Sequence, residues 1–233
     1  MQLFICSDFE EQGSELIIKN NGDLIQQLRK VLRAKPWYVF YVQDFQWEQR
    51  IKLELIKYTE SEIYTKILER KKNLNEKVMI GMLIAFPNKQ EKLELIVQKL
   101  TEIGISHIYF RKAENSQIKE LNENKIKRMR KIMKEALEQS RWWEFPQIEI
   151  VRDLNPLWKI WNFCVFDIEK KEKSDIIKQV SLPPLWVIWP EGGLSQKDYQ
   201  RFPINYKVHS LWDTVLRMET AAFIGAWYLK RGI

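Results

Sequence analysis

The sequence contains few of the residues from which metal sites and disulfide frameworks are built. Cys6 and Cys164 are its only cysteines, His107 and His209 are its only histidines, and each pair is widely separated. A structural zinc site needs closely spaced ligands, and disulfide scaffolds need many cysteines in a short chain. We therefore expect two free thiols, no metal ion and no histidine-based catalysis.

A long apolar segment is also missing. The longest apolar run, residues 78–86, is much shorter than the roughly 20 residues that cross a bilayer, so it predicts a buried strand. The N-terminal stretch MQLFICSDFEE has no basic region followed by an apolar one, so we expect no signal peptide. These features indicate a cytoplasmic protein without a membrane partner.

Glycine is scarce and tryptophan is abundant. The 233 residues include 8 glycines and 10 tryptophans, whereas the average glycine usage of roughly 7% would give about 16 glycines. The charge is biased as well, with a net charge of +7 and a pI of about 9.2. A basic balance favours a polyanionic partner such as nucleic acid, although a generic basic surface would give the same count.

The first 70 residues consist of short segments rich in Ile, Val, Tyr and Phe, separated by turn residues such as those at 20–23. This pattern predicts β-strands, with one short helix at residues 24–32. We therefore expect a small β-barrel with one helix in residues 1–72 and a polar linker at 69–76. The expected strands cover residues 3–6, 15–19, 38–42, 50–57 and 62–68.

Strands and helices alternate in residues 73–233, which predicts a separate α/β domain with a mostly parallel sheet. Gly104 supplies the stop of the first helix, and Ser195 with Asp198 forms a weak capping box for a short helix. The expected strands cover residues 78–86, 105–111, 161–167, 185–189 and 208–211, and the expected helices cover residues 92–103, 118–140, 174–180 and 216–230.

Two loops that follow expected strands carry unusual residues. In WPEGGLS, residues 189–195, two glycines expose backbone groups that can grip a ligand, and Glu191 can hold a hydroxyl or a cation. In SLWDTVLRMETAA, residues 210–222, Arg217 and Glu219 open the last helix. Ligands of parallel sheets bind at the C-terminal ends of strands, so both loops are candidate ligand contacts. A plain turn followed by a capped helix is the alternative.

These segments, in this order, resemble the bacterial ribosomal RNA small subunit uridine N3-methyltransferase family (the RsmE family) of the SPOUT class. The resemblance rests on the two loops and on three further stretches, and it covers nearly the whole chain. The further stretches are LRKVLRAKP at residues 28–36, LELIVQKLTEIGI at 93–105 and EALEQS at 135–140.

The resemblance implies an N-terminal PUA-like β-barrel and a C-terminal SPOUT domain with a deep trefoil knot. Knots are exceptions to the usual chain topology, so periodicity does not predict one. The family forms homodimers and methylates N3 of a uridine in 16S ribosomal RNA with S-adenosylmethionine; we expect the assembled small subunit as substrate. The implied cofactor contacts are Trp189, Pro190, Glu191, Gly192, Gly193, Leu211, Trp212, Val215 and Leu216. The catalytic candidates are Arg217, Glu219 and Glu191.

Basic residues in the matched segments are the expected phosphate contacts. A denser basic group lies on the expected helix at 118–140, where a solvated helix face is the alternative. Trp142 and Trp143 could stack on RNA bases or belong to a core or dimer interface. The expected phosphate contacts are Arg29, Lys30, Arg33, Lys99 and Arg141.

Tryptophan replaces glycine at three points of the resemblance. Trp37, Trp189 and Trp212 stand where the family has the glycines of KPG, GPEGG and SLG. We hypothesise that these codons are UGA, which some bacterial genetic codes read as glycine and others as tryptophan; UGG codons at all three positions would exclude this. The rival hypothesis is an inactive RNA-binding protein whose indoles fill the cofactor pocket. A generic small-molecule-binding α/β domain, a third possibility, would need neither the barrel nor the basic surface.

Overall fold

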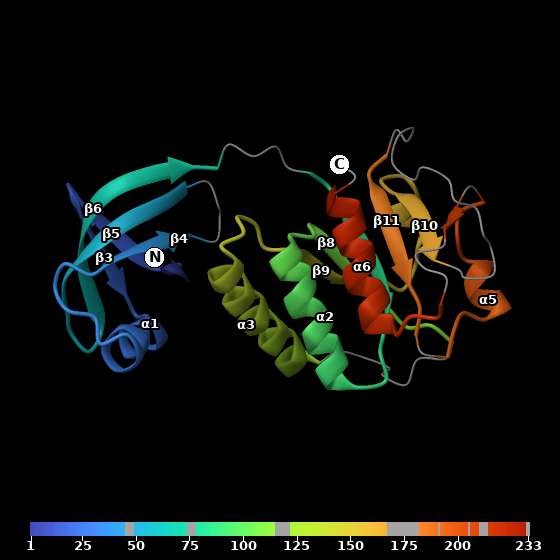
Figure 1. Cartoon of the computed structure of the whole chain (residues 1–233), viewed down its shortest axis with the longest axis horizontal. Coiled ribbons are helices and arrows are strands. Elements are labelled where there is room, and N and C mark those ends of the chain that lie inside the picture. The colour runs from blue at the N-terminus through green and yellow to red at the C-terminus, as the bar shows by residue number, and fades with distance from the viewer. Residues whose placement is uncertain are drawn as a thin grey trace. The chain divides into compact units, whose positions relative to one another are not determined.

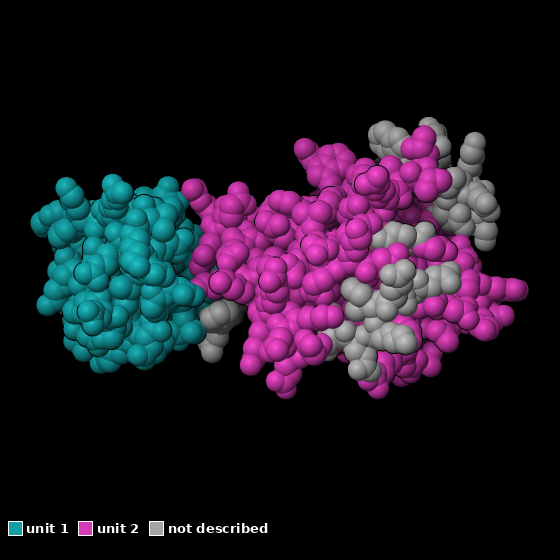
Figure 2. Space-filling view, turned by 90° about the horizontal axis from the view of Figure 1, so that it is seen from below, with its two compact units in different colours: residues 1–76 teal, residues 77–233 magenta. Residues whose placement is uncertain are grey.

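The computed structural model describes residues 1–44, 49–73, 78–114, 122–166, 182–190, 192–204, 206–209 and 214–231. The chain divides into two compact units, Met1–Glu76 (unit 1) and Lys77–Ile233 (unit 2), which are coloured separately in Figure 2. The expected helix at 174–180 and three predicted site residues, Glu191, Leu211 and Trp212, lie outside the described residues.

Six strands of unit 1 form one mixed sheet in the order β1-β4-β5-β6-β3-β2 (Figure 1). Among the described strands, β1 and β4 pair in parallel and the other neighbours pair antiparallel. Their inward side chains form an apolar core, which confirms the expected β-rich N-terminal domain. The strands are β1 (Leu3–Ile5), β2 (Phe9–Gln12), β3 (Glu15–Lys19), β4 (Val39–Gln43), β5 (Gln49–Tyr58) and β6 (Glu62–Lys72).

The helical segment of unit 1 begins slightly earlier than the sequence predicts. The helix α1 (Gly22–Gln26) starts after Asn21, whose Oδ1 accepts a hydrogen bond from Leu24 N at 3.1 Å and so caps the helix. A π-helical turn, η1 (Gln27–Val31), continues it. The predicted linker is wrong at residues 69–72, because these residues belong to β6 and pair with β5. Their side chains are exposed, which explains their linker-like composition.

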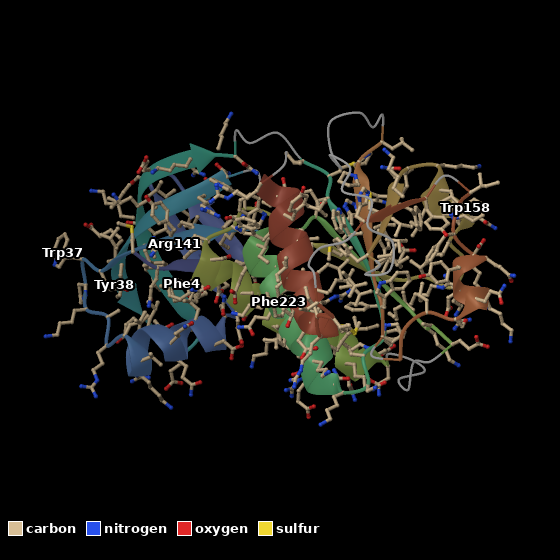
Figure 3. All side chains as sticks on the ribbon, turned by 45° about the vertical axis from the view of Figure 1, so that its right-hand side comes forward. Phe4, Trp37, Tyr38, Arg141, Trp158 and Phe223 are labelled. Atoms are coloured by element: carbon tan, nitrogen blue, oxygen red, sulfur yellow. The ribbon has the colours of Figure 1, made fainter. Side chains whose placement is uncertain are left out.

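Trp37 has a backbone conformation that favours glycine. Tyr38 N donates a hydrogen bond to Lys35 O at 3.1 Å, which closes a four-residue turn. Pro36 is the second residue of this turn, and Trp37, with φ 77°, is the third. This is the arrangement of a type II turn, whose third position normally holds glycine because an L side chain is strained there. The indole is 77% exposed and projects from the unit (Figure 3). The turn therefore supports the hypothesis of a glycine at position 37.

Replacing Trp37 by glycine is expected to raise the free energy of unfolding by about 1 kcal/mol, since left-handed strain of about 1–2 kcal/mol is relieved. The exposed indole contributes little packing that could be lost. Urea unfolding would measure the change. Lys35→Gly is the matched control, because Lys35 is exposed in the same turn and has no positive φ; added flexibility should lower stability there. A loss of stability in Trp37→Gly would contradict the strain.

The described strands of unit 2 form a parallel sheet in the order β12-β10-β11-β7-β8-β9 (Figure 1). The expected α/β domain with a parallel sheet is thus confirmed, although the sequence did not predict β9 or the short helix α4. The strands are β7 (Gly81–Ala85), β8 (His107–Arg111), β9 (Gln147–Ile150), β10 (Asn162–Phe166), β11 (Pro184–Ile188) and β12 (Lys207–His209). The helices are α2 (Gln90–Ile103), α3 (Glu123–Ser140), α4 (Asn155–Trp158), α5 (Gln196–Tyr199) and α6 (Met218–Arg231).

Alternate strand residues supply two separate cores, one on each face of the sheet of unit 2. Met82 and Ile84 of β7 belong to the core to which α2, α3 and α6 contribute. Leu83 lies between them in the chain and belongs to the opposite core, together with Trp161 and Phe202. The continuous apolar run of β7 follows from this burial on both faces.

The neighbouring strands β7 and β11 lead the chain toward opposite edges of the sheet. From β7 the chain continues through α2 to β8 and then to β9, whereas from β11 it continues through α5 to β12. In open parallel sheets, ligands bind where adjacent strands diverge in this way, at their C-terminal ends. A ligand site is therefore expected at the ends of β7 and β11.

Both cysteines are free and buried, which confirms the expected thiols. Burial raises the pKa of the Cys164 thiol to about 12, and the thiolate is the reactive form. We expect the folded protein to react only slowly with a chromogenic disulfide reagent at pH 8, and both thiols to react at once in guanidinium chloride. Rapid stoichiometric reaction of the folded protein would contradict this burial.

Candidate active site

A small cavity lies at the C-terminal ends of β7, β8 and β11, where the diverging strands predict a ligand. The strand ends line it together with Leu194, Asp198 and Phe202. Among its described lining residues, Arg111 and Asp198 carry charges and the others are apolar. Apolar side chains with a few convergent polar groups are the usual lining of a small-molecule site. The volume is about 20 Å³, so a ligand group that enters must be small or must displace lining side chains.

The loop after β11 is a tight turn. Gly193 N donates to Pro190 O at 2.9 Å, and Gly193 has φ 71°, a left-handed value that favours glycine. A Cβ built on Gly193 would meet no atom within 4 Å, so the backbone angle explains this glycine better than close packing does. Pro190 is buried, whereas Gly192 and Gly193 are exposed. The turn thus presents accessible backbone beside the cavity.

Trp189 fills space at the same edge of the sheet. Its ring centroid lies 5.6 Å from that of Tyr199 in α5 and 6.2 Å from that of Phe202. Its Nε1 donates a hydrogen bond to the carbonyl of Phe166, the last residue of β10. The half-buried indole therefore lies at the end of β10, in a volume that glycine at position 189 would leave open.

The predicted capping box of α5 is present. Ser195 Oγ accepts a hydrogen bond from Asp198 N at 3.2 Å, and Asp198 Oδ2 accepts one from Ser195 N at 3.2 Å. Glu114, three residues after β8, forms a 3.0 Å ion pair with Lys197 of α5. These contacts hold α5 over the ends of the strands and place the buried Asp198 carboxylate on the cavity.

The segment before α6 carries other predicted site residues. α6 begins directly after Arg217, whose side chain is exposed, and Figure 1 shows α6 beginning at the edge where β11 ends. Glu219 Oε2 lies 3.4 Å from Nζ of Lys92, in the first turn of α2. Val215 is 86% exposed and Leu216 is half-buried. Glu219 is therefore anchored between two helix starts, whereas Arg217 and Val215 face solvent.

The predicted phosphate contacts are spread over both units. Arg29, Lys30 and Arg33 are exposed on or beside η1 of unit 1. Lys99 forms a 2.9 Å ion pair within α2, and Arg141 is the exposed C-cap residue of α3. The structure thus leaves the first group accessible and engages Lys99 in its own helix.

The basic face of α3 is partly used in ion pairs. Arg128 Nε lies 2.6 Å from Glu94 Oε1 of α2, and this hydrogen-bonded guanidinium lowers the pKa of Glu94. Lys134 lies 3.8 Å from Glu138. These contacts support a structural role for Arg128 and Lys134.

Trp142 packs within unit 2. Its indole lies against Gly104, and Lys230 Nζ is 4.1 Å from the ring centroid. This packing favours the core alternative for Trp142 over base stacking.

No helix in the described ranges is long and apolar enough to cross a membrane. The same ranges hold no group of three or more His, Cys, Asp or Glu residues arranged to bind a metal ion.

The family relationship follows from the sequence of unit 2. Residues 74–229 match the family described as RNA methyltransferase domain. This chain belongs to the RNA methyltransferase family. Within the family, ribosomal RNA small subunit methyltransferase E of Bacillus subtilis is 35% identical over 150 residues, which are 57% of this chain and 58% of that protein. The match thus spans less than two thirds of the relative, and it confirms the resemblance that the motifs indicate.

Solved structures show that the similarity in fold extends over both units. The ribosomal RNA small subunit methyltransferase E of Neisseria gonorrhoeae, bound to S-adenosyl methionine, has a TM-score of 0.83 at 20% identity, covering 99% of this chain and 97% of that one. A putative methyltransferase of Legionella pneumophila, also with bound cofactor, has a TM-score of 0.82 at 18% identity, with the same coverage. The trefoil knot and the homodimer stay predictions.

The charged lining of the cavity was missed from the sequence. Arg111 was assigned only to a strand end, and Asp198 only to a capping box. The sequence did contain one signal, because Arg111 is a charged residue at the C-terminal end of an apolar strand. The position of β8 beside β7, which brings Arg111 to the cavity, is a tertiary feature.

Proposed function

We propose that this RNA methyltransferase transfers the methyl group of S-adenosylmethionine to N3 of a uridine in small-subunit (16S) ribosomal RNA. The observation that carries the proposal is the exposed turn of Gly192 and Gly193 beside a cavity at diverging strand ends. The name of the Bacillus subtilis relative supports the substrate, and the bound ligands of the two solved structures support the cofactor.

We propose that the cofactor contacts the turn at residues 189–193 and the segment before α6. Backbone groups of residues 189–193 hold the adenosine, and residues 211, 212, 215 and 216 complete its pocket. When bound, the cofactor supplies an electrophilic methyl group on a positively charged sulfur. The protein holds uridine N3 in line with that methyl group, and such positioning supplies much of the acceleration.

The N3 proton must leave as the new bond forms, and Glu219 and Glu191 are the proposed carboxylates near it. Lys92 anchors Glu219 at 3.4 Å, so this carboxylate has a defined place at the start of α6. Arg217, the exposed residue before it, is proposed to orient the RNA or the cofactor.

Unit 1, the proposed PUA-like RNA-binding domain, provides exposed cations for the RNA backbone. Arg29 and Lys30 lie in η1 and Arg33 follows it, and Lys99 and Arg141 extend the proposed contacts to unit 2. The net charge of +7 favours a polyanion. We further propose a cytoplasmic homodimer that acts on the assembled small subunit.

Calorimetric titration of S-adenosylmethionine into two proteins tests the proposal. One is the chain itself, and the other carries Trp37→Gly, Trp189→Gly and Trp212→Gly. Binding by the glycine variant, followed by methylation of small subunits lacking the modification, supports the enzyme. If the chain itself also binds, the pocket tolerates the indoles. If neither binds, the methyltransferase proposal falls.

A second candidate is an RNA-binding protein of the same fold without catalysis. The packing of the Trp189 indole against Tyr199 and Phe202 favours it, because a ligand would have to displace that ring. UGG codons at the three positions, with binding to ribosomal RNA fragments but not to the cofactor, would select this candidate.

A further inference from the structure

Arg111 is a buried cation that lines the same cavity as the carboxylate of Asp198. It ends β8 beside Ala85 of β7, its side chain lines the cavity, and it is 9% exposed. The guanidinium has five N–H donors, and the carboxylates of Asp198 and Asp153 interact favourably with its charge. Burial lowers the pKa of Arg111, because the charge is removed from water. Removing a charge from water is costly, so an anionic group that accepts hydrogen bonds from the guanidinium would stabilise Arg111.

Asp198 places a second polar group on the same cavity. Its side chain is buried, and Oδ2 accepts hydrogen bonds from Ser195 N at 3.2 Å and from Ser195 Oγ at 3.0 Å. Oδ1 lies 3.9 Å from Arg201 Nη1, an ion-pair distance that is too long for a hydrogen bond. Oδ1 therefore retains its capacity to accept from a ligand.

We propose that Arg111 and Asp198 bind the zwitterionic amino-acid end of S-adenosylmethionine, an inference that rests on the function proposed above. The α-carboxylate accepts hydrogen bonds from the Arg111 guanidinium, and the α-ammonium donates one to Asp198 Oδ1. Each charge of the ligand then meets an opposite charge, and charge-assisted hydrogen bonds are the strong ones. In a cavity that is otherwise apolar, these two contacts fix the orientation of the cofactor.

An RNA phosphate complements these two residues less well. A phosphate would satisfy Arg111, but the Asp198 carboxylate on the same cavity would repel it. A backbone phosphate is also flanked by two riboses, whereas an unbranched amino-acid end can enter a buried cavity alone. The opposite charges of Arg111 and Asp198 thus match a zwitterion rather than an anion.

The test compares two probes in Arg111→Met. S-adenosylhomocysteine carries the amino-acid end, whereas 5′-methylthioadenosine lacks it. The substitution is made in the protein with the printed sequence, or in the triple glycine variant if only that variant binds S-adenosylmethionine. We expect Arg111→Met to weaken S-adenosylhomocysteine binding by about 10- to 100-fold and to leave methylthioadenosine binding unchanged. Arg201→Met is the matched control, since Arg201 is exposed near the same carboxylate, and it should change neither affinity.

Thermal unfolding without ligand adds a readout that separates binding from folding. Arg111→Met should change Tm by no more than about 4 °C, because the removal of a buried charge stabilises the fold while the loss of a favourable neighbour of Asp198 destabilises it. A larger fall in Tm, or equal losses for the two probes, would assign Arg111 a structural role and overturn the inference. Unchanged affinity for both probes with weaker binding to ribosomal RNA would assign it to a phosphate. If the parent protein binds neither probe, it is the proposed function that fails.

Discussion

Replacing Trp189 by glycine is expected to tighten S-adenosylmethionine binding by about 100-fold. A ligand at the end of β10 must displace the indole from Tyr199, Phe202 and the Phe166 carbonyl. Moving this half-buried indole out of its packing should cost about 3 kcal/mol, the low end of the range for large aromatic side chains, which corresponds to about 100-fold in Kd. Calorimetry with Trp212→Gly already in place measures this difference, because only residue 189 then varies.

Trp37→Gly in the same background is the matched control. It makes the same chemical change in the turn of unit 1 and should leave the Kd for the cofactor unchanged. If Trp189→Gly also leaves the Kd unchanged, the indole does not occupy the place of the cofactor. The glycine hypothesis would then rest on the backbone of residue 37 and on the codons.

Gly104→Ala is expected to lower the free energy of unfolding of unit 2 by about 3 kcal/mol, the sum of left-handed strain and overpacking. Gly104 has φ 86°, and a Cβ there would lie 2.5 Å from the Trp142 ring. Lys230 covers that ring, which restricts its movement. Scanning calorimetry should show a Tm lower by about 6–12 °C, at about 2–4 °C for each kcal/mol in a domain of this size.

Gly193→Ala separates the left-handed strain from the overpacking. Gly193 has φ 71°, but a Cβ there would meet no atom within 4 Å. Only the strain remains, so the cost should be about 1–2 kcal/mol. An equal loss of stability in both variants would mean that strain alone sets the cost at Gly104 and that Trp142 moves aside.

The features that were predicted correctly depend on neighbouring residues in the chain. Gly104 ends α2 because a left-handed residue closes the helix, and Ser195 with Asp198 caps α5 through contacts three residues apart. The missed strands β2 and β9 are mostly exposed, so their sequences lack a strong apolar alternation. The linker at 69–76 was misplaced for the same reason, because the end of β6 is paired but not buried.

By itself, the sequence determined the two-part organisation, the parallel α/β domain, the family and the turn at residues 189–193. Short-range patterns and ordered motifs carry this information. Only the tertiary structure brought Arg111 and Asp198, which are 87 positions apart, to one cavity. It also showed that Trp37 has a backbone conformation that favours glycine and that Trp189 packs against Tyr199. The physical reason is that strand order, burial and backbone angles arise from contacts between segments distant in the chain, which no local pattern encodes.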